Sequence, residues 1–179
     1  IGYIKKTVIG DVMNIKKVRV DKEGTGMGWG AVYAQYLESM DQIGEQGNGL
    51  SVSRQLYKGD EALNESAPLK VGDKITVRLT VKADRDMDFV QIKDDRAACM
   101  EPLQAVSGFR WSNGLGYYQA TKDASTQFFI DQMRKGTYVI EYQVYVNRTG
   151  EYQTGIATVQ SAYAPEFGGH TGGYRVMVE

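Results

Sequence analysis

The feature that most limits the fold of this chain is a strict alternation of polar and apolar residues at positions 74–82. In this segment, KITVRLTVK, every second side chain is apolar. Successive side chains of a β-strand point to opposite faces of a sheet, so a period of two places all the apolar residues on one face. The segment is therefore predicted to be a strand with one buried and one exposed face.

Other segments repeat this pattern. Residues 137–146 (TYVIEYQVYV) alternate in the same way, and a further strand is expected over residues 151–163. The intervening NRTG has hairpin-turn chemistry, so these two strands are predicted to pair antiparallel. Weaker patterns predict strands over residues 15–20, 29–37, 50–58, 88–93, 128–133 and 174–178.

Residues 30–43 leave two interpretations open. Ala31, Ala34, Leu37 and Met40 have helical spacing, whereas the aromatic and β-branched content favours a strand for the first half. No alternation of strands and helices occurs elsewhere, which excludes a βαβ architecture. The fold class predicted for the chain is all-β, an Ig-like antiparallel β-sandwich.

The charge and hydrophobicity of the chain limit the classes of partner that it can bind. The 21 Lys and Arg residues nearly balance 22 Asp and Glu residues, which gives a net charge of -1 and no basic patch for nucleic acid or an anionic membrane. No apolar stretch approaches the roughly 20 residues of a membrane span, and no signal peptide opens the chain. We therefore expect no nucleic-acid partner and no direct membrane contact. A start at Ile1 rather than Met suggests a fragment of a longer protein.

Two short patterns match binding motifs only in part. GMGWGA at residues 26–31 fits a dinucleotide-binding fingerprint, but no βαβ unit surrounds it, which favours a Gly-rich strand start. Asp84, Asp86, Asp88 and Asp95 have the spacing of calcium ligands in an EF-hand loop. However, Phe89 stands where that loop needs glycine, so a solvated strand face is the preferred interpretation.

The chain has one cysteine, Cys99, and one histidine, His170. A Cys99/His170 dyad is conceivable, but no third group is recognisable, and a small buried hydrophobe is the commoner role of such a cysteine. A zinc site with four N or S ligands is excluded. An internal thioester of the C-x-E-Q type is also excluded, because Pro102 occupies the glutamine position. We predict no enzyme activity, no metal and no cofactor.

Specific residues carry a resemblance to a known family. DMDFVQIKDDRAACMEP (residues 86–102) and SGFRW (107–111) resemble the C-terminal macroglobulin-like domain of bacterial α-2-macroglobulins, particularly the large Bacteroidetes proteins. The resemblance extends over residues 50–179, and WGAVYAQYLE (29–38) resembles the opening strand of that domain. It implies a macroglobulin-like β-sandwich over residues 25–179. Residues 1–24 would then be a linker or the tail of the preceding domain.

The resemblance implies a non-catalytic part of a protease trap in the cell envelope, either periplasmic or anchored to the outer membrane. Such proteins have a bait region and a thioester in a separate helical domain, neither of which lies in this chain. The implied partners are other domains of the parent chain, with target proteases reached indirectly. The alternative from another class is a free-standing secreted adhesin or carbohydrate-binding sandwich with a Tyr/Trp surface.

A candidate site follows from the same resemblance. In some bacterial members a Tyr-bearing loop of this domain shields the thioester from water. WSNGLGYYQATKD (residues 111–123) is the best positional match, which makes Tyr117 and Tyr118 the candidate shielding and docking residues. Both tyrosines fit cross-strand packing roles equally well.

Overall fold

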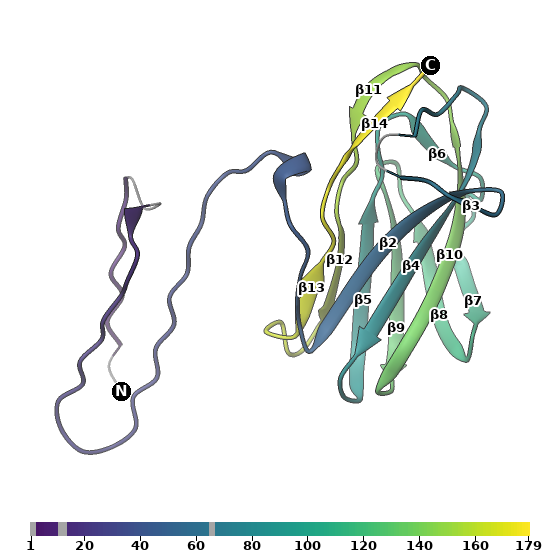
Figure 1. The fold of residues 1–179 in the computed structure, drawn as a ribbon. Helices are drawn as coiled ribbons and strands as arrows, with labels where there is room; N and C mark the ends of the chain where they lie inside the picture. The colour runs from purple at the N-terminus through teal and green to yellow at the C-terminus, as the bar shows by residue number, and fades with distance from the viewer. Residues whose placement is uncertain (1–2, 11–13, 65–66) are drawn as a thin grey trace. The chain divides into compact units, whose positions relative to one another are not determined.

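The chain separates into two compact units, Ile1–Leu37 and Glu38–Glu179, in a computed structural model that describes residues 3–10, 14–64 and 67–179 (Figure 1). Within the first unit, the described residues form no β-strand, and their side chains are all exposed. The strands predicted over residues 15–20 and 29–37 are therefore wrong for this chain. Alternation favours a strand, but a strand also needs neighbours that pair with its backbone.

The described residues of the second unit form β-strands and one short 3-10 helix, η2 (Met40–Gln42), which confirms the all-β prediction. The strands are β1 (Gln46–Asn48), β2 (Leu50–Lys58), β3 (Glu61–Ala62), β4 (Lys74–Ala83), β5 (Met87–Asp95), β6 (Met100–Pro102), β7 (Gly108–Ser112), β8 (Leu115–Thr121), β9 (Ser125–Met133), β10 (Gly136–Val146), β11 (Gly150–Gln153), β12 (Ala157–Ser161), β13 (Gly168–His170) and β14 (Arg175–Val178). The strongest alternation, at residues 74–82, coincides with β4. Its side chains are buried at every second position.

Strand pairing runs in the order β6-β10-β4-β2-β1-β13-β12-β5-β9-β8-β7, with β3 beside β2 and a separate β11-β14 pair. The sheet folds over at β1 and β13, so that β2, β4 and β10 face β5, β9 and β8, as the layers in Figure 1 show. The largest fully buried side chains include Phe128, Ile75, Leu79 and Ile92. They come from both layers, and the hydrophobic core of the sandwich lies between them.

Glycines at β1 and β13 allow the strands to approach closely where the sheet turns from one layer into the other. Gly47 of β1 lies opposite Gly169 of β13. A Cβ on Gly169 would lie 2.7 Å from the carbonyl oxygens of both Gln46 and Leu50, which is closer than real side chains approach backbone. Only a residue without a side chain lets these strands come together where the sheet turns.

A buried ion pair connects the layers through the core. The Arg54 guanidinium on β2 lies 2.6 Å from the Asp94 carboxylate on β5, and these side chains are 5% and 1% exposed. The Tyr142 hydroxyl on β10 donates a hydrogen bond to the second oxygen of Asp94 at 2.8 Å. Burial raises the pKa of Asp94 and, together with the Asp94 charge, raises the pKa of Tyr142. Burial works against the Arg54 charge, but the adjacent Asp94 outweighs it, so the pKa of Arg54 is raised.

The predicted pairing of residues 137–146 with residues 151–163 is wrong. β10 pairs instead with β4 and, at its end, with β6. Since both sides of β10 are occupied there, the chain has to cross to other partners: β11 pairs with β14, and β12 with β5 and β13. The predicted strand is also interrupted at residues 154–156. There Arg54 donates hydrogen bonds to the Thr154 hydroxyl at 3.0 Å and the Gly155 carbonyl at 2.5 Å.

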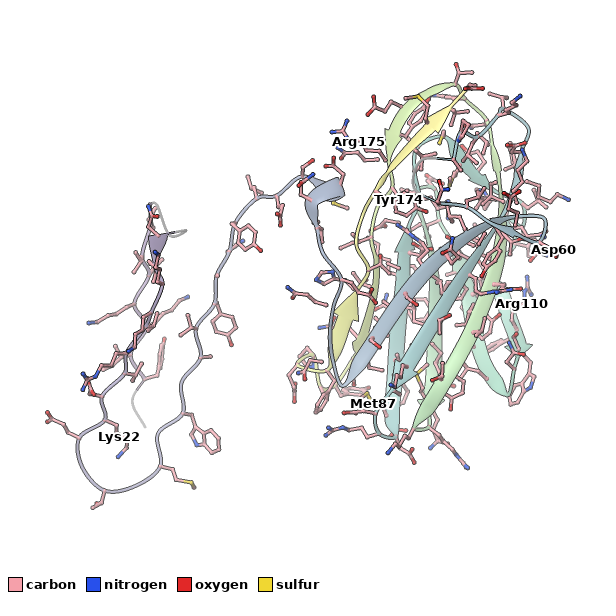
Figure 2. The ribbon with its side chains drawn as sticks, in the orientation of Figure 1. Lys22, Asp60, Met87, Arg110, Tyr174 and Arg175 are labelled. Carbon is pink, nitrogen blue, oxygen red and sulfur yellow. The ribbon has the colours of Figure 1, made fainter. Side chains whose placement is uncertain are left out.

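The chain that leads into the sandwich is fastened to the C-terminal region. Asp41 of η2 forms an ion pair with Arg175 at 2.8 Å. Arg175, labelled in Figure 2, is the first residue of β14. The Ser39 hydroxyl and Arg175 both hydrogen-bond to the Asp41 carboxylate and lower its pKa to about 2. Met40 passes so close to Gly173 that no Cβ would fit there. We call residues 39–43 the N-terminal strap.

Candidate functional site

The segment that was predicted to be the shielding loop is a β-hairpin. β7 and β8 pair from Gly108 opposite Gln119 to Ser112 opposite Leu115, and only two residues connect them. These two, Asn113 and Gly114, have φ of 50° and 78°, which is typical of the tight turn that Asn-Gly favours. The loop interpretation of residues 111–123 is therefore wrong, because the Asn-Gly turn reverses the chain at once. β7 is the last strand of its layer, so one edge of the hairpin is free.

The two candidate tyrosines lie on opposite faces of β8. Tyr117 points into the core, is 6% exposed and packs edge-on against Phe128 with ring centroids 5.6 Å apart. Burial raises the pKa of Tyr117 despite the opposing charge of Arg110. Tyr118 is half-buried on the outer face, 5.1 Å from Phe109 in an edge-to-face arrangement. Of the pair, Tyr118 is the one whose ring lies at the surface.

Tyr118 belongs to a larger group of aromatic residues on this outer face. We define the aromatic face as the set of partly or largely exposed rings on or next to β5, β7, β8 and β9, namely Phe89, Phe109, Trp111, Tyr118, Phe129 and Tyr163. The rings of Phe109 and Trp111 are 78% and 77% exposed. Most of these residues were missed in the sequence. The alternation in GFRW places Phe109 and Trp111 on one face, and the adjacent Phe128 and Phe129 indicate one ring inside and one outside.

Strand register arranges these rings in a row. Phe109 lies opposite Tyr118, and Tyr118 lies opposite Phe129. Beside this row, Trp111 lies opposite Gly116, and a Cβ on Gly116 would be 2.8 Å from two atoms of the Trp111 ring. The absence of a side chain at Gly116 therefore allows the indole to lie close to the backbone.

Phe89 has a strained backbone. Its φ is 53°, in the left-handed region that bulky residues avoid. At this point β5 breaks its alternation, since Asp88 and Phe89 are both exposed between buried Met87 and Val90. The Phe89 ring meets Tyr163 edge-on at 5.1 Å. A strained backbone conformation persists where contacts with the surrounding structure enforce it, and such residues are concentrated at functional sites.

Two grooves lie near the aromatic rings and on the neighbouring strands. The first, of about 810 Å³, is lined by residues that include Arg110, Trp111, Phe129, Asp131, Arg134 and Tyr138. The second, of about 610 Å³, lies over β1, β12 and β13, and its polar lining includes Gln46, Asn48, Thr158, Gln160 and His170. The lining of the second groove also includes Gly47, Gly168 and Gly169.

The structure does not bring the other sequence candidates together. Cys99 is completely buried beside β6, which confirms its predicted role as a small core residue, and burial raises the pKa of its thiol. His170 is half-buried on β13 in the other layer. Asp84 pairs with Arg85, and Asp95 pairs with Lys93. Among the described residues no group of His, Cys, Asp and Glu has the arrangement of a metal site.

The Gly-rich segment at residues 26–31 lies in the first unit, where all its side chains are exposed and no helix follows directly. In the part of the chain that the structure describes, no helix has the length and hydropathy of a membrane span.

Comparison with known proteins identifies related sequences and folds. Residues 49–166 match the family model of the bacterial alpha-2-macroglobulin MG10 domain. The circularly permutated Ras protein 2 of Dictyostelium discoideum is 28% identical over 166 residues, which are 89% of this chain but 4% of that protein.

Solved structures show the same fold. A Tyr-to-Gly mutant of Salmonella alpha-2-macroglobulin matches with a TM-score of 0.63 and 20% identity, over 75% of this chain and 10% of that one. Native Escherichia coli alpha-2-macroglobulin, from domain MG7 to the C-terminus, matches with a TM-score of 0.63 and 17% identity. The match covers 75% of this chain and 24% of that one. The present chain thus spans only a small part of the proteins that it matches.

Proposed function

Because the chain belongs to the family of bacterial alpha-2-macroglobulin MG10 domains, we propose that it is a non-catalytic domain of an α-2-macroglobulin-like protease inhibitor. Its partners in this proposal are the other domains of its own parent chain, and proteases are reached only through the parent. The family match over residues 49–166 is the observation that carries the proposal. The proposed location of the parent protein is the cell envelope. Residues 1–24 would be the tail of the preceding domain or a linker.

The absence of catalysis is supported by the state of the candidate nucleophile. Cys99 is completely buried, and its raised pKa favours the thiol, whereas the thiolate is the reactive form. His170 lies on a strand of the opposite layer. Neither residue is placed as a nucleophile with its base.

We propose that the β7–β8 hairpin is the element that docks against the parent. Its support is the exposure of Phe109 and Trp111, since aromatic side chains are enriched at protein interfaces and large exposed ones mark interaction sites. Arg110 between them reaches back to the Phe109 carbonyl at 3.2 Å and so partly covers the free backbone edge. Docking would therefore use the rings rather than strand addition.

Hydrogen exchange in the full-length parent tests the docking. Phe109 and Trp111 alternate with the residues bonded to β8, so their amides face the free edge. We expect these amides to exchange more slowly in the intact parent than in this isolated chain. Tyr145, exposed on the other layer, is the reference position and should not change. Equal exchange at β7 in parent and isolated chain would place the docking surface elsewhere.

We propose that Tyr118 shields the thioester of the parent from water. Tyr117 is the adjacent core residue that anchors β8. An aromatic ring over an acyl bond excludes water at small entropic cost. In a thioester-bearing parent, Tyr118→Ala should shorten the half-life of the thioester towards hydrolysis. Tyr117→Phe keeps the buried ring and serves as the control. An unchanged half-life in Tyr118→Ala removes the shielding role from this residue.

A further inference from the structure

We infer that the outer face of the layer β13-β12-β5-β9-β8-β7 is a binding strip for a neutral glycan chain. This goes beyond the proposed function. Because Phe109 and Tyr118 also belong to the β7–β8 hairpin, a glycan would occupy the whole strip only where the hairpin is not docked. The inference starts from strand register, which aligns particular side chains across the layer.

One row of residues crosses the whole layer. Successive directly paired positions are Asn48, Gly168, Gln160, Gln91, Phe129, Tyr118 and Phe109. Directly opposite residues of paired strands share a face of the sheet. Since neighbouring strands lie about 4.8 Å apart, this row is roughly 29 Å long. Such a row suits an extended polymer that lies across the strands.

The chemistry along the row suits hydroxyl groups and apolar sugar faces. Gln160 and Gln91 are exposed, and an amide offers a donor and an acceptor side by side, as adjacent hydroxyls require. The Gln160 amide also donates to the Pro165 carbonyl at 3.2 Å, which fixes its position. At the other end, Phe129, Tyr118 and Phe109 offer rings on which the apolar face of a sugar stacks.

None of the seven residues of the row is charged, and the charged groups Arg110, Asp131 and Arg134 lie in the groove beside the rings. Lys93, in the neighbouring row, forms an ion pair with Asp95 at 2.9 Å and is thereby neutralised. The other residues in that row include His170, Thr158 and Gln127. A neutral ligand that forms many hydrogen bonds fits this surface better than a charged polymer.

The two kinds of side chain lie at opposite ends of the strip. Here the rings gather at the β7 edge of the layer, and the amides gather towards β13, so the polarity changes along the row. Each end has its own groove, of about 810 Å³ beside the rings and about 610 Å³ beside the amides.

Affinity electrophoresis of this chain in gels that contain soluble neutral polysaccharides tests the inference. The probes are hydroxyethylcellulose, dextran and galactomannan, and a hexasaccharide of the retained polymer gives the dissociation constant by calorimetry. We expect retardation by at least one polymer. Tyr118→Ala should weaken binding about tenfold, and Gln91→Ala about three- to tenfold.

Matched controls lie on the outer face of the other layer. Tyr145 and Gln143 of β10 are exposed and present the same two side-chain types. Tyr145→Ala and Gln143→Ala should bind like the unchanged chain. Circular dichroism of all four variants verifies that each is folded.

Three results would overturn the inference. The first is the absence of retardation by all of the polymers. The second is binding that Tyr118→Ala and Gln91→Ala leave unchanged, since the glycan would then lie elsewhere. The third is binding that the β10 variants weaken equally. Gln91 lies outside the β7–β8 hairpin, so Gln91→Ala should leave the thioester half-life unaltered, and the two proposals fail separately.

Discussion

Among single residues, Arg54 has the most demanding environment. Its guanidinium is almost completely buried and serves Asp94, Thr154 and Gly155 at once. A buried ion pair gains little over an apolar pair of the same size, but removal of one partner leaves the other charge without compensation. The pair therefore holds the two layers in one register more than it adds net stability.

We expect Arg54→Ala to lower the free energy of unfolding by about 3–5 kcal/mol, because Asp94 stays buried and loses its cation. The double variant Arg54→Met with Asp94→Leu should lose less, since neither charge of the pair then remains buried. Urea denaturation measures both. Lys93→Ala removes a partly exposed ion pair with Asp95 and is the control with little effect. A double variant that is less stable than Arg54→Ala would contradict this account.

Phe89 gives a prediction of unusual sign. Glycine normally weakens a strand relative to alanine, but left-handed backbone costs a residue with a side chain about 1–2 kcal/mol. Phe89→Gly should therefore be more stable than Phe89→Ala in urea denaturation. At Gln91, two positions further along the same strand, the alanine variant should be more stable than the glycine variant. If alanine is better at both positions, Phe89 is not strained.

At the scale of elements, the β7–β8 hairpin depends on its two-residue turn. Gly114 has φ of 78°, and no atom lies near the position of an added Cβ. Gly114→Ala should thus destabilise through backbone conformation alone, by about 1 kcal/mol. Gly44→Ala, also in open space but without positive φ, is the control and should cost nothing. Thermal unfolding of both variants provides the comparison.

The N-terminal strap gives a prediction about pH. The pKa of Asp41 is lowered from 3.8 to about 2 in the folded chain, so the strap gains stability from the carboxylate above pH 3.8. That contribution is lost as the pH falls from about 4 to about 2. The protection factors of the amides of residues 39–43, which compare their exchange with that of an unfolded chain at the same pH, should fall over this window. Ser39→Ala removes the larger cause of the shift and should raise the pKa of Asp41, which an NMR titration detects; an unchanged pKa contradicts it.

For the whole molecule, the two units should differ in protease resistance. Lys16, Lys17, Arg19 and Lys22 are exposed in the first unit and lie outside any strand. Proteases cut exposed, unpaired backbone first. Brief trypsin treatment should remove the first 22 residues and leave a fragment from Glu23 to the C-terminus, as mass spectrometry would reveal. Early cleavage after Arg54 would contradict the fold, since Arg54 is buried in β2.

The sequence alone predicts the strands whose stability comes from their own alternation, such as β2 and β4. It does not predict their partners, because pairing depends on which edges other strands already occupy; β10 is paired on both sides where a hairpin was expected. The candidate site likewise has a part that the sequence could indicate and a part that depends on strand pairing. Tyr118 could be found from a resemblance, whereas Gln160, Gln91 and Phe129 become neighbours only through pairing of β12, β5 and β9.

The N-terminal strap also determines how the sandwich would bear mechanical load. A pull on the chain before residue 38 is transmitted first to the Asp41–Arg175 pair and to the contact of Met40 with Gly173. Both fasten the strap to the segment that leads into β14, which pairs with β11 apart from the main sheet. Tension would therefore peel away the strap before it reached β1, whereas β14 is held in the core by Val176 and Val178. The sandwich would keep its fold while the chain leading into it changed direction.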